Sequence, residues 1–136
     1  MNQIMEGTQV AKTIIVPVDG SDAALKVIPY AAELAQAYGD DLLLLNIQAT
    51  LKELGMPAIA KVSSMIDHSE YTVATKIRVG IPAIEIVTEA HDPNVRCVVM
   101  AIGKGHQEEI GSVSKQVLEL ATCPVMLVPE HAENRK

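Results

Sequence analysis

Tryptophan and phenylalanine are absent from this 136-residue sequence, and tyrosine, with three copies, is its one aromatic residue type. Proteins that bind single-stranded nucleic acid stack the bases on aromatic side chains, and such a platform is missing here. Positive charge is also scarce, because 11 Lys and Arg residues face 17 Asp and Glu residues, which gives a formal net charge of −6. A basic patch that displaces the counterions of a polyanion is therefore not expected. We predict that neither nucleic acid nor an anionic membrane is a partner.

Long apolar runs and paired cysteines are missing as well. No apolar run approaches the ~20 residues of a membrane span, and residues 1–12 lack the apolar centre of a secretory signal. Cys97 and Cys123 lie 26 residues apart, with no C-x-x-C pair and no histidine at ligand spacing. The sequence therefore predicts a cytoplasmic protein without a disulfide or a zinc site, in which both cysteines are small apolar core residues.

The length of 136 residues fits one domain that is large enough to bury a core without disulfides or metals. Both ends are polar, so we expect a flexible segment over 1–12, a domain over 13–130 and a flexible tail over 131–136. Hydrophobic residues make up 49% of the chain, and without large aromatics the core must be packed from Ile, Val, Leu, Met and Ala.

Apolar segments of two kinds alternate along the chain. Five are short and β-branched or continuously apolar, as strands covered on both faces are: 13–18, 41–47, 73–79, 97–102 and 125–128. Helices are predicted from the caps Ser21 and Asp22 to Gly39, from Pro82 to Asp92, from about Ser112 to before Pro124, and, more weakly, within 51–68. The predicted inward faces carry Leu25, Ile28, Ala32, Ala35 and Gln36 in the first helix, Ile84, Val87 and His91 in the second, and Val113, Val117, Leu118 and Ala121 in the third.

Strict alternation of strand and helix predicts an open, five-stranded, parallel, doubly wound α/β sheet with helices on both faces. Ligands of such sheets bind beyond the carboxyl ends of the strands, where the strand order reverses. Two polar, glycine-bearing segments follow strands there, namely 19–22 after the first strand and 103–112 after the fourth. We expect these two segments to converge.

The segment after the fourth strand has the composition of an anion-binding loop. Glycines at 103, 105 and 111 remove Cβ atoms where a phosphate approaches the backbone. The helix that opens at Gly111 and Ser112 directs its unpaired N–H groups and the positive end of its dipole toward the same place. Phosphate binding is the first functional hypothesis.

Three common phosphate motifs do not fit this segment. Gly103-Lys104 is followed by Gly105 rather than Ser or Thr, so it is not a Walker A loop. A dinucleotide fingerprint would need a small residue where Glu108 stands and would open the first βαβ unit. A phosphoacceptor receiver domain would need an aspartate at the end of the third strand, which instead ends at Val79.

The chain resembles the universal stress protein family. The resemblance rests on Val16-Pro-Val-Asp-Gly-Ser-Asp22, Tyr30-Ala-Ala-Glu-Leu-Ala35, Gly80-Ile-Pro-Ala-Ile-Glu-Ile86, Gly111-Ser-Val-Ser114 and Cys123-Pro-Val-Met-Leu-Val-Pro129. These motifs occur in the family's order over about residues 12–130. The resemblance implies a Rossmann-like fold similar to the adenine nucleotide alpha hydrolases and a stress-response role.

The family's nucleotide-binding branch implies a regulatory ATP or AMP, with Mg²⁺ or Mn²⁺ bound through the phosphates. The residues that this resemblance assigns to the nucleotide are Pro17, Val18, Asp19, Ile47, Met100, Ala101, Gly103, Lys104, Gly105, Gly111, Ser112 and Val113. Two departures stand out: Ala101 occupies a position where glycine is usual, and the interval from Ala101 to Gly111 is about three residues shorter than in that branch.

Several loop residues have both a functional and a structural interpretation. Asp19 either contacts a ribose, an adenine edge or a phosphate-bound metal, or caps a turn. Ser112 either bonds a phosphate or is a helix N-cap. Lys104 and His106 are candidate phosphate donors or solvated loop residues, whereas Glu108-Glu109 is best interpreted as a solvated face.

Catalytic signatures are missing from the sequence. It contains no Gly-x-Ser-x-Gly turn, no spaced His-Asp partner and no evident pair of contrasting carboxylates, so any ATP hydrolysis is expected to be slow. Two hypotheses remain open: a nucleotide-binding universal stress protein that acts on an unknown protein partner, and one without nucleotide that acts as a dimeric interaction module. In either case we predict a homodimer through Val125, Met126, Leu127 and Val128, because a terminal strand can lie on an exposed edge and related proteins dimerise there.

Overall fold

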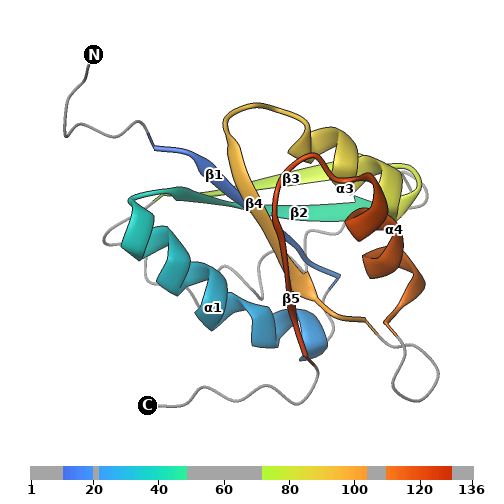
Figure 1. Ribbon diagram of the computed structural model, residues 1–136. Helices are drawn as coiled ribbons and strands as arrows, with labels where there is room; N and C mark the ends of the chain where they lie inside the picture. The colour runs from blue at the N-terminus through green and yellow to red at the C-terminus, as the bar shows by residue number, and fades with distance from the viewer. Residues whose placement is uncertain (1–10, 20–21, 49–71, 104–109, 130–136) are drawn as a thin grey trace.

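The structure, a computed structural model, describes residues 11–19, 22–48, 72–103 and 110–129. Strands and helices alternate along the described chain, as Figure 1 shows, except between β2 and β3, whose connection lies outside the described residues. In chain order they are β1 (Thr13–Pro17), α1 (Asp22–Tyr38), β2 (Asp41–Gln48), β3 (Val73–Val79), α3 (Pro82–Ala90), β4 (Val95–Ala101), α4 (Ser112–Leu120) and β5 (Val125–Val128). The five predicted strands and the three principal helices are confirmed, while the weaker helix within 51–68 lies outside the described residues.

All strand pairs are parallel, and the five strands have the order β3-β2-β1-β4-β5. Along the chain, β2 pairs with one side of β1 and β3 pairs with the outer side of β2. The chain then crosses back, and β4 pairs with the other side of β1. The strand order therefore reverses between β1 and β4, which is where open α/β sheets bind ligands. The predicted doubly wound fold is confirmed.

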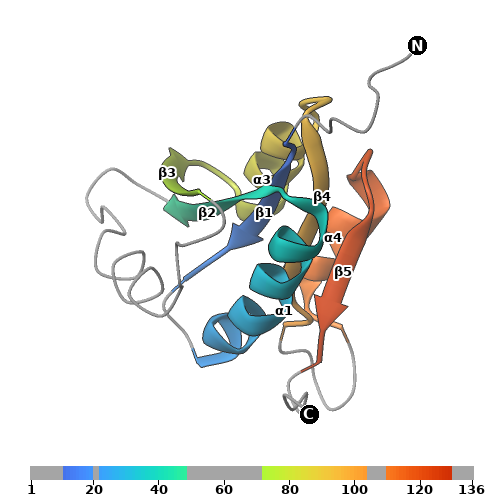
Figure 2. The same ribbon diagram turned by 90° about the vertical axis from the view of Figure 1, so that its left-hand side faces the viewer.

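The sheet has an apolar core on each face. Helix α1 covers one face and helices α3 and α4 cover the other, as Figures 1 and 2 show together. Ile14 and Leu44 belong to the cluster beneath α1, whereas Ile15 and Leu45, each one residue further along its strand, belong to the cluster beneath α3 and α4. Successive side chains of a strand point to opposite faces of the sheet. Because helices cover both faces, β1 and β2 are apolar at most of their positions.

Helix α1 ends where the sequence predicts. Gly39 takes φ +71°, the left-handed conformation that glycine adopts without a Cβ penalty. The next amide, that of Asp40, donates to the carbonyl of Ala35 at 2.9 Å and so closes the last turn. Pro29 lies inside the helix on its exposed side without ending it.

The predicted inward faces of the helices need correction. The buried residues of α3 are Ala83, Ile86 and Ala90. Of the predicted inward residues, Val87 is half-buried against the cluster beneath α3 and α4, whereas Ile84 and His91 are exposed. Gln36 of α1 and Leu118 of α4 are exposed, whereas Val27 and Ala31 of α1 and Ser114 of α4 are buried. In α3 the small Ala83 and Ala90 lie against the sheet beside Ile86, whereas the larger Ile84 is turned outward.

Strand β3 was expected to be covered on both faces, and that expectation was wrong. It is an edge strand, and Ala74, Thr75 and Lys76 are exposed in the described structure. Only one side of β3 pairs with a described strand, namely β2. Its alternating Lys76 and Arg78 fit this edge position, since charged side chains discourage further strand pairing.

Candidate functional site

A cavity of about 540 Å³ opens at the carboxyl ends of the strands, where the strand order reverses. This volume lies within the range of small-molecule sites. The walls come from the ends of β1, β2 and β4 and from the first turns of α3 and α4. The lining residues are Pro17, Val18, Asp19, Leu45, Ile47, Pro82, Ile86, Met100, Ala101, Gly103, Gly111, Ser112, Val113 and Ser114.

The sequence predicted most of this lining. Every predicted nucleotide residue that the structure describes is among the lining residues, and Lys104 and Gly105 lie outside the described residues. The expected convergence of the segments after the first and fourth strands is confirmed. Their contact with a nucleotide stays a prediction.

Sequence reasoning missed four lining residues: Leu45, Pro82, Ile86 and Ser114. Pro82 and Ile86 lie on α3, one turn apart, so they belong to one face of that helix. The Gly-x-Pro signal located the start of α3, but nothing in it indicates that this start faces a cavity. Ser114 follows Ser112 by two residues, and its burial was not expected.

The β1 side of the cavity is fixed by hydrogen bonds to β2. The amide of Val18 donates to the carbonyl of Leu45 at 2.9 Å, although β1 itself ends at Pro17. The side-chain amide of Asn46 is buried, and its Nδ2 donates to the carbonyl of Val18 at 2.7 Å. Gln48 Nε2 donates in turn to Asn46 Oδ1. These bonds fix the backbone from which Asp19 extends to the cavity.

The α4 side presents the start of a helix. Gly111 is the N-cap, with φ −60° and ψ 156°, and its carbonyl accepts the first helical bond from the amide of Lys115 at 3.0 Å. Ser112 is therefore the first helical residue, and its interpretation as an N-cap was wrong. The amides of Ser112 and Val113 lie in the first turn, where no intrahelical carbonyl reaches them, at the positive end of the helix dipole. Both residues line the cavity.

Glycine is required at position 103 by the protein itself. Gly103 takes φ +86°, a left-handed conformation that other residues rarely adopt. A Cβ atom at this position would lie 3.2 Å from the Gly111 Cα and 3.3 Å from the Ser114 Oγ. The end of β4 and the start of α4 are thus packed backbone against backbone.

Ala101, the first departure from the family pattern, causes no visible conflict. It is the last residue of β4, and its side chain packs against the apolar cluster beneath α1. The preceding Met100 packs on the opposite side, beneath α3 and α4. The extra methyl group therefore contributes to the α1 side of the core.

The described lining carries a single charged side chain, which is negative. Asp19 is the one ionisable residue among the described lining residues. No group of three or more His, Cys, Asp or Glu side chains suited to a metal ion occurs in residues 11–19, 22–48, 72–103 and 110–129. An anion at this end of the cavity would be bound by backbone amides and hydroxyl groups.

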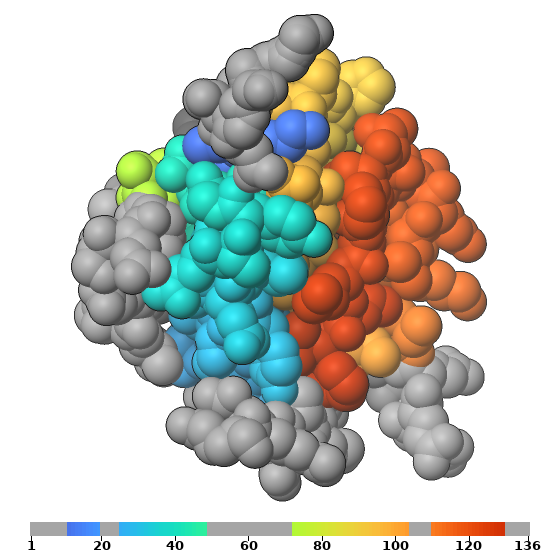
Figure 3. Space-filling model, turned by 60° about the vertical axis from the view of Figure 1, so that its left-hand side comes forward, coloured from blue at the N-terminus to red at the C-terminus, as the bar shows by residue number. Residues whose placement is uncertain are grey.

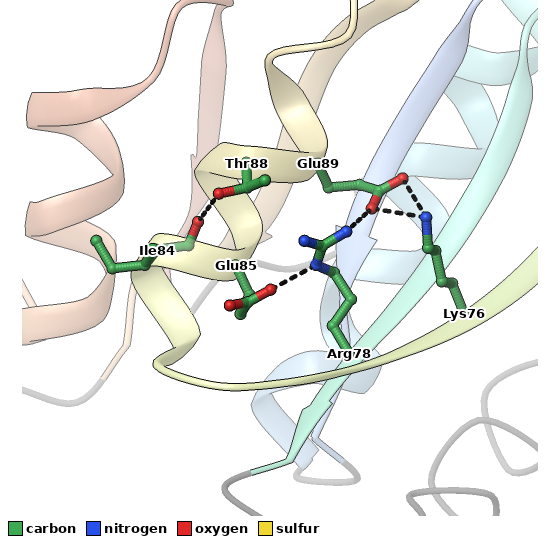
Figure 4. Close-up of polar contacts among 6 residues, drawn as sticks. All are labelled: Lys76, Arg78, Ile84, Glu85, Thr88 and Glu89. Atoms are coloured by element: carbon green, nitrogen blue, oxygen red, sulfur yellow. Dashed lines mark hydrogen bonds and ion pairs between the residues drawn. The ribbon is translucent and has the colours of Figure 1, made fainter.

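Ion pairs hold α3, which carries Pro82 and Ile86, against the edge strand β3. Arg78 Nε donates to Glu85 at 2.6 Å and its Nη1 donates to Glu89 at 2.9 Å, while Lys76 bonds the same Glu89 carboxylate, as Figure 4 shows. The hydrogen bond that Arg78 donates to Glu85, the largest influence, raises the pKa of Arg78 above its usual value. The guanidinium therefore joins two carboxylates that lie one turn apart on α3 and fixes the position of the helix on the sheet.

The cysteines form no part of this cavity. Cys97 is buried and Cys123 half-buried, both are free thiols, and burial raises the pKa of each. Cys97 is a core residue as expected, and Cys123 packs against the cluster beneath α3 and α4. Among the described residues, no helix is both long and apolar enough to cross a membrane.

The sequence matches the model of the universal stress protein family over residues 11–70 and 58–129. The chain belongs to the universal stress protein family. Universal stress protein MJ0531 of Methanocaldococcus jannaschii is 30% identical over 146 aligned positions, which cover 92% of this chain and 86% of that protein.

Solved structures of other universal stress proteins share the fold. The Archaeoglobus fulgidus protein in complex with dAMP aligns with a TM-score of 0.72 at 22% identity, covering 87% of this chain and 97% of that one. A universal stress protein family protein from Arabidopsis thaliana with AMP bound aligns with a TM-score of 0.70 at 18% identity, covering 89% and 93%. These similarities confirm the predicted α/β fold.

Proposed function

We propose that this universal stress protein binds an adenine nucleotide, AMP or ATP, in the cavity between β1 and β4 as a regulatory ligand. The observation that carries the proposal is the convergence, on one cavity of about 540 Å³, of an apolar wall, a glycine-bearing strand end and the open start of α4. Binding of dAMP and AMP by proteins of the same fold supports the choice of an adenine nucleotide.

The two sides of the cavity suit different parts of the nucleotide. Apolar side chains such as Val18 and Ile47 suit the base, and the Asp19 carboxylate suits the hydroxyl groups of a ribose. The first-turn amides of Ser112 and Val113 suit the phosphate, since helix starts favour anions. A divalent cation, Mg²⁺ or Mn²⁺, would be bound through the phosphates.

The first test uses the absence of tryptophan. With only three tyrosines the protein absorbs weakly in the near ultraviolet, so an adenine base that copurifies dominates the absorbance spectrum. We expect either such a spectrum or, after dialysis, measurable heat on titration with AMP. A preparation that carries no adenine and gives no heat at millimolar AMP or ATP contradicts the proposal.

A homodimer through β5 is the second part of the proposal. Among the described strands β5 pairs only with β4, so its outer edge presents unpaired backbone groups. Met126 is 41% exposed on this strand, and Figure 3 shows the β5 region at the surface beside α1. A second copy that pairs with this edge would satisfy the backbone groups and cover Met126.

The same edge supports the alternative function, a dimeric interaction module that works without nucleotide on a protein partner. Leu120 at the end of α4 and Met126 on β5 are large apolar side chains that remain exposed. A dimer whose stability and partner binding are the same with and without AMP would favour this alternative. A cytoplasmic location stays a prediction in both cases.

A further inference from the structure

Ser114 is a buried polar residue whose hydroxyl bonds outside its own helix. It lies on α4, is 2% exposed and shares the inward face with Val117, one turn later. A buried helical serine commonly bonds the carbonyl four residues earlier. The Ser114 Oγ instead donates to the carbonyl of Ala101, at 3.0 Å, on β4. The hydroxyl therefore joins the helix to the strand end.

The carbonyl of Ala101 needs this partner because of the strand order. The amides of Val98 and Ile102 bond to the β5 side of β4, so the alternation of the strand directs the Ala101 carbonyl toward β1. The pairing of β1 with β4, however, ends at Ile15 and Val98. Beyond that pair no β1 residue is in register with Ala101. Where β1 and β4 diverge, the Ala101 carbonyl is not paired with β1, and the Ser114 hydroxyl donates a hydrogen bond to it instead.

A second hydrogen bond acts beside the first. The amide of Gly111 donates to the carbonyl of Ile102 at 3.2 Å. Gly103 fits between these segments because it lacks a side chain, as a Cβ atom there would lie 3.3 Å from the Ser114 Oγ. Together the two bonds set the distance and angle between the end of β4 and the first turn of α4.

We infer that Ser114 is a positioning residue of the nucleotide site, an inference that rests on the proposed function. Its hydroxyl holds the first turn of α4 against β4, so that the amides of Ser112 and Val113 face the phosphate position in the cavity. Its role is specific to the phosphate, because the walls that suit the base and the ribose come from β1 and β2. Ser114 thus influences AMP binding more than adenosine binding.

The experiment compares AMP with adenosine, which lacks the phosphate, by calorimetric titration of the full chain. Ser114→Ala removes the hydroxyl and is expected to lower the ratio of AMP affinity to adenosine affinity about tenfold, roughly the value of one hydrogen bond. Val117→Ala is the matched control, because Val117 is fully buried one turn further along α4 and does not line the cavity. It is expected to reduce stability and leave the ratio unchanged.

Each other outcome overturns the inference in a recognisable way. Suppose that wild-type protein binds AMP and that Ser114→Ala has the wild-type ratio of AMP affinity to adenosine affinity; Ser114 then has no positioning role. If Val117→Ala lowers this ratio as much as Ser114→Ala does, the role is not specific to Ser114. If wild-type protein binds adenosine and AMP equally, the adenine site stands and the phosphate role of the α4 amides is wrong. If it binds neither, the proposed function fails and this inference fails with it. Should Ser114→Ala not fold, Ser114→Cys replaces the hydroxyl with a poorer donor, and a wild-type ratio in that variant overturns the inference.

Discussion

Arg96 holds the carboxylate of Asp40, a residue 56 positions earlier in the chain. Asp40 is fully buried, and its Oδ1 also accepts a hydrogen bond from the amide of Lys12 at 3.0 Å. The Arg96 guanidinium stacks on the Tyr38 ring at 4.1 Å from the ring centre, and the hydrogen bond to Asp40 raises the pKa of Arg96. This cluster ties the end of α1 to the amino-terminal ends of the strands.

Replacing Arg96 tests the importance of that cluster. Arg96→Met keeps most of the stem but leaves the buried Asp40 carboxylate without its cation. We expect a loss of about 2 to 3 kcal/mol in the free energy of unfolding, less than for a fully buried pair because Arg96 is 28% exposed. Lys76→Met, at an ion pair whose lysine is 46% exposed, is the control and should cost under about 1 kcal/mol. Equal losses in urea unfolding of the two variants would contradict the special role of Arg96.

The nucleotide proposal predicts thermal stabilisation by AMP or ATP. A ligand that binds only the folded state stabilises it by about 2.7 kcal/mol at one hundred times its Kd, and Tm rises accordingly. Gly111→Asp should abolish the rise, because the carboxylate would lie at the start of α4 where the phosphate is proposed to bind. Gly111→Asn is the neutral control of equal size, and it should retain part of the rise. Both substitutions suit an N-cap position, and a full Tm shift in the aspartate variant would show that the phosphate lies elsewhere.

ATP hydrolysis by the purified protein is expected to be very slow or undetectable. Among the described lining residues Asp19 is the one carboxylate, and none of these residues is an arginine or lysine that could stabilise a transferring phosphoryl group. The test measures the release of inorganic phosphate from ATP by the wild-type protein and by the Asp19→Ala variant. Rapid release that the substitution removes would show that Asp19 acts as a base.

The dimer proposal predicts that Met126→Lys gives a folded monomer. Met126 is 41% exposed, so the substitution leaves the core intact and places a charge at the proposed contact. Ile84→Lys is the matched control, because Ile84 is 46% exposed on α3 rather than on β5. Light scattering should report a monomer for the first variant and a dimer for the second. A dimer that survives Met126→Lys excludes β5 as the contact.

The order and type of the elements could be predicted because each strand is a short β-branched or apolar run and each helix has a clear start or end signal. Pro82 marks the start of α3 and Gly39 the end of α1, and both signals depend only on local backbone geometry. Convergence of the cavity residues followed from topology alone, since the ends of parallel strands meet at one edge. These inferences require no knowledge of side-chain packing.

The errors share one physical cause. The large apolar Ile84 was assigned to the core, whereas the small Ala83 and Ala90 lie against the sheet, so hydrophobic periodicity identified the helix and misplaced its face by one residue. Ser114 was missed because its partner, Ala101, is 13 residues away, and a serine three positions into a helix ordinarily indicates nothing. Contacts between elements depend on distances that no local pattern contains.

A backbone hydrogen bond joins Ile102, at the end of β4, to Gly111, at the start of α4. Because the amide of Gly111 reaches the carbonyl of Ile102 at 3.2 Å, the two strand-to-helix ends are joined independently of how many residues connect them. Lengthening a connection whose two ends are already held together costs little entropy. The length of the connection and the geometry of its ends thus become separable properties, so that evolution or a protein engineer can exchange residues 104–109 while the hydrogen bond between Gly111 and Ile102 is kept.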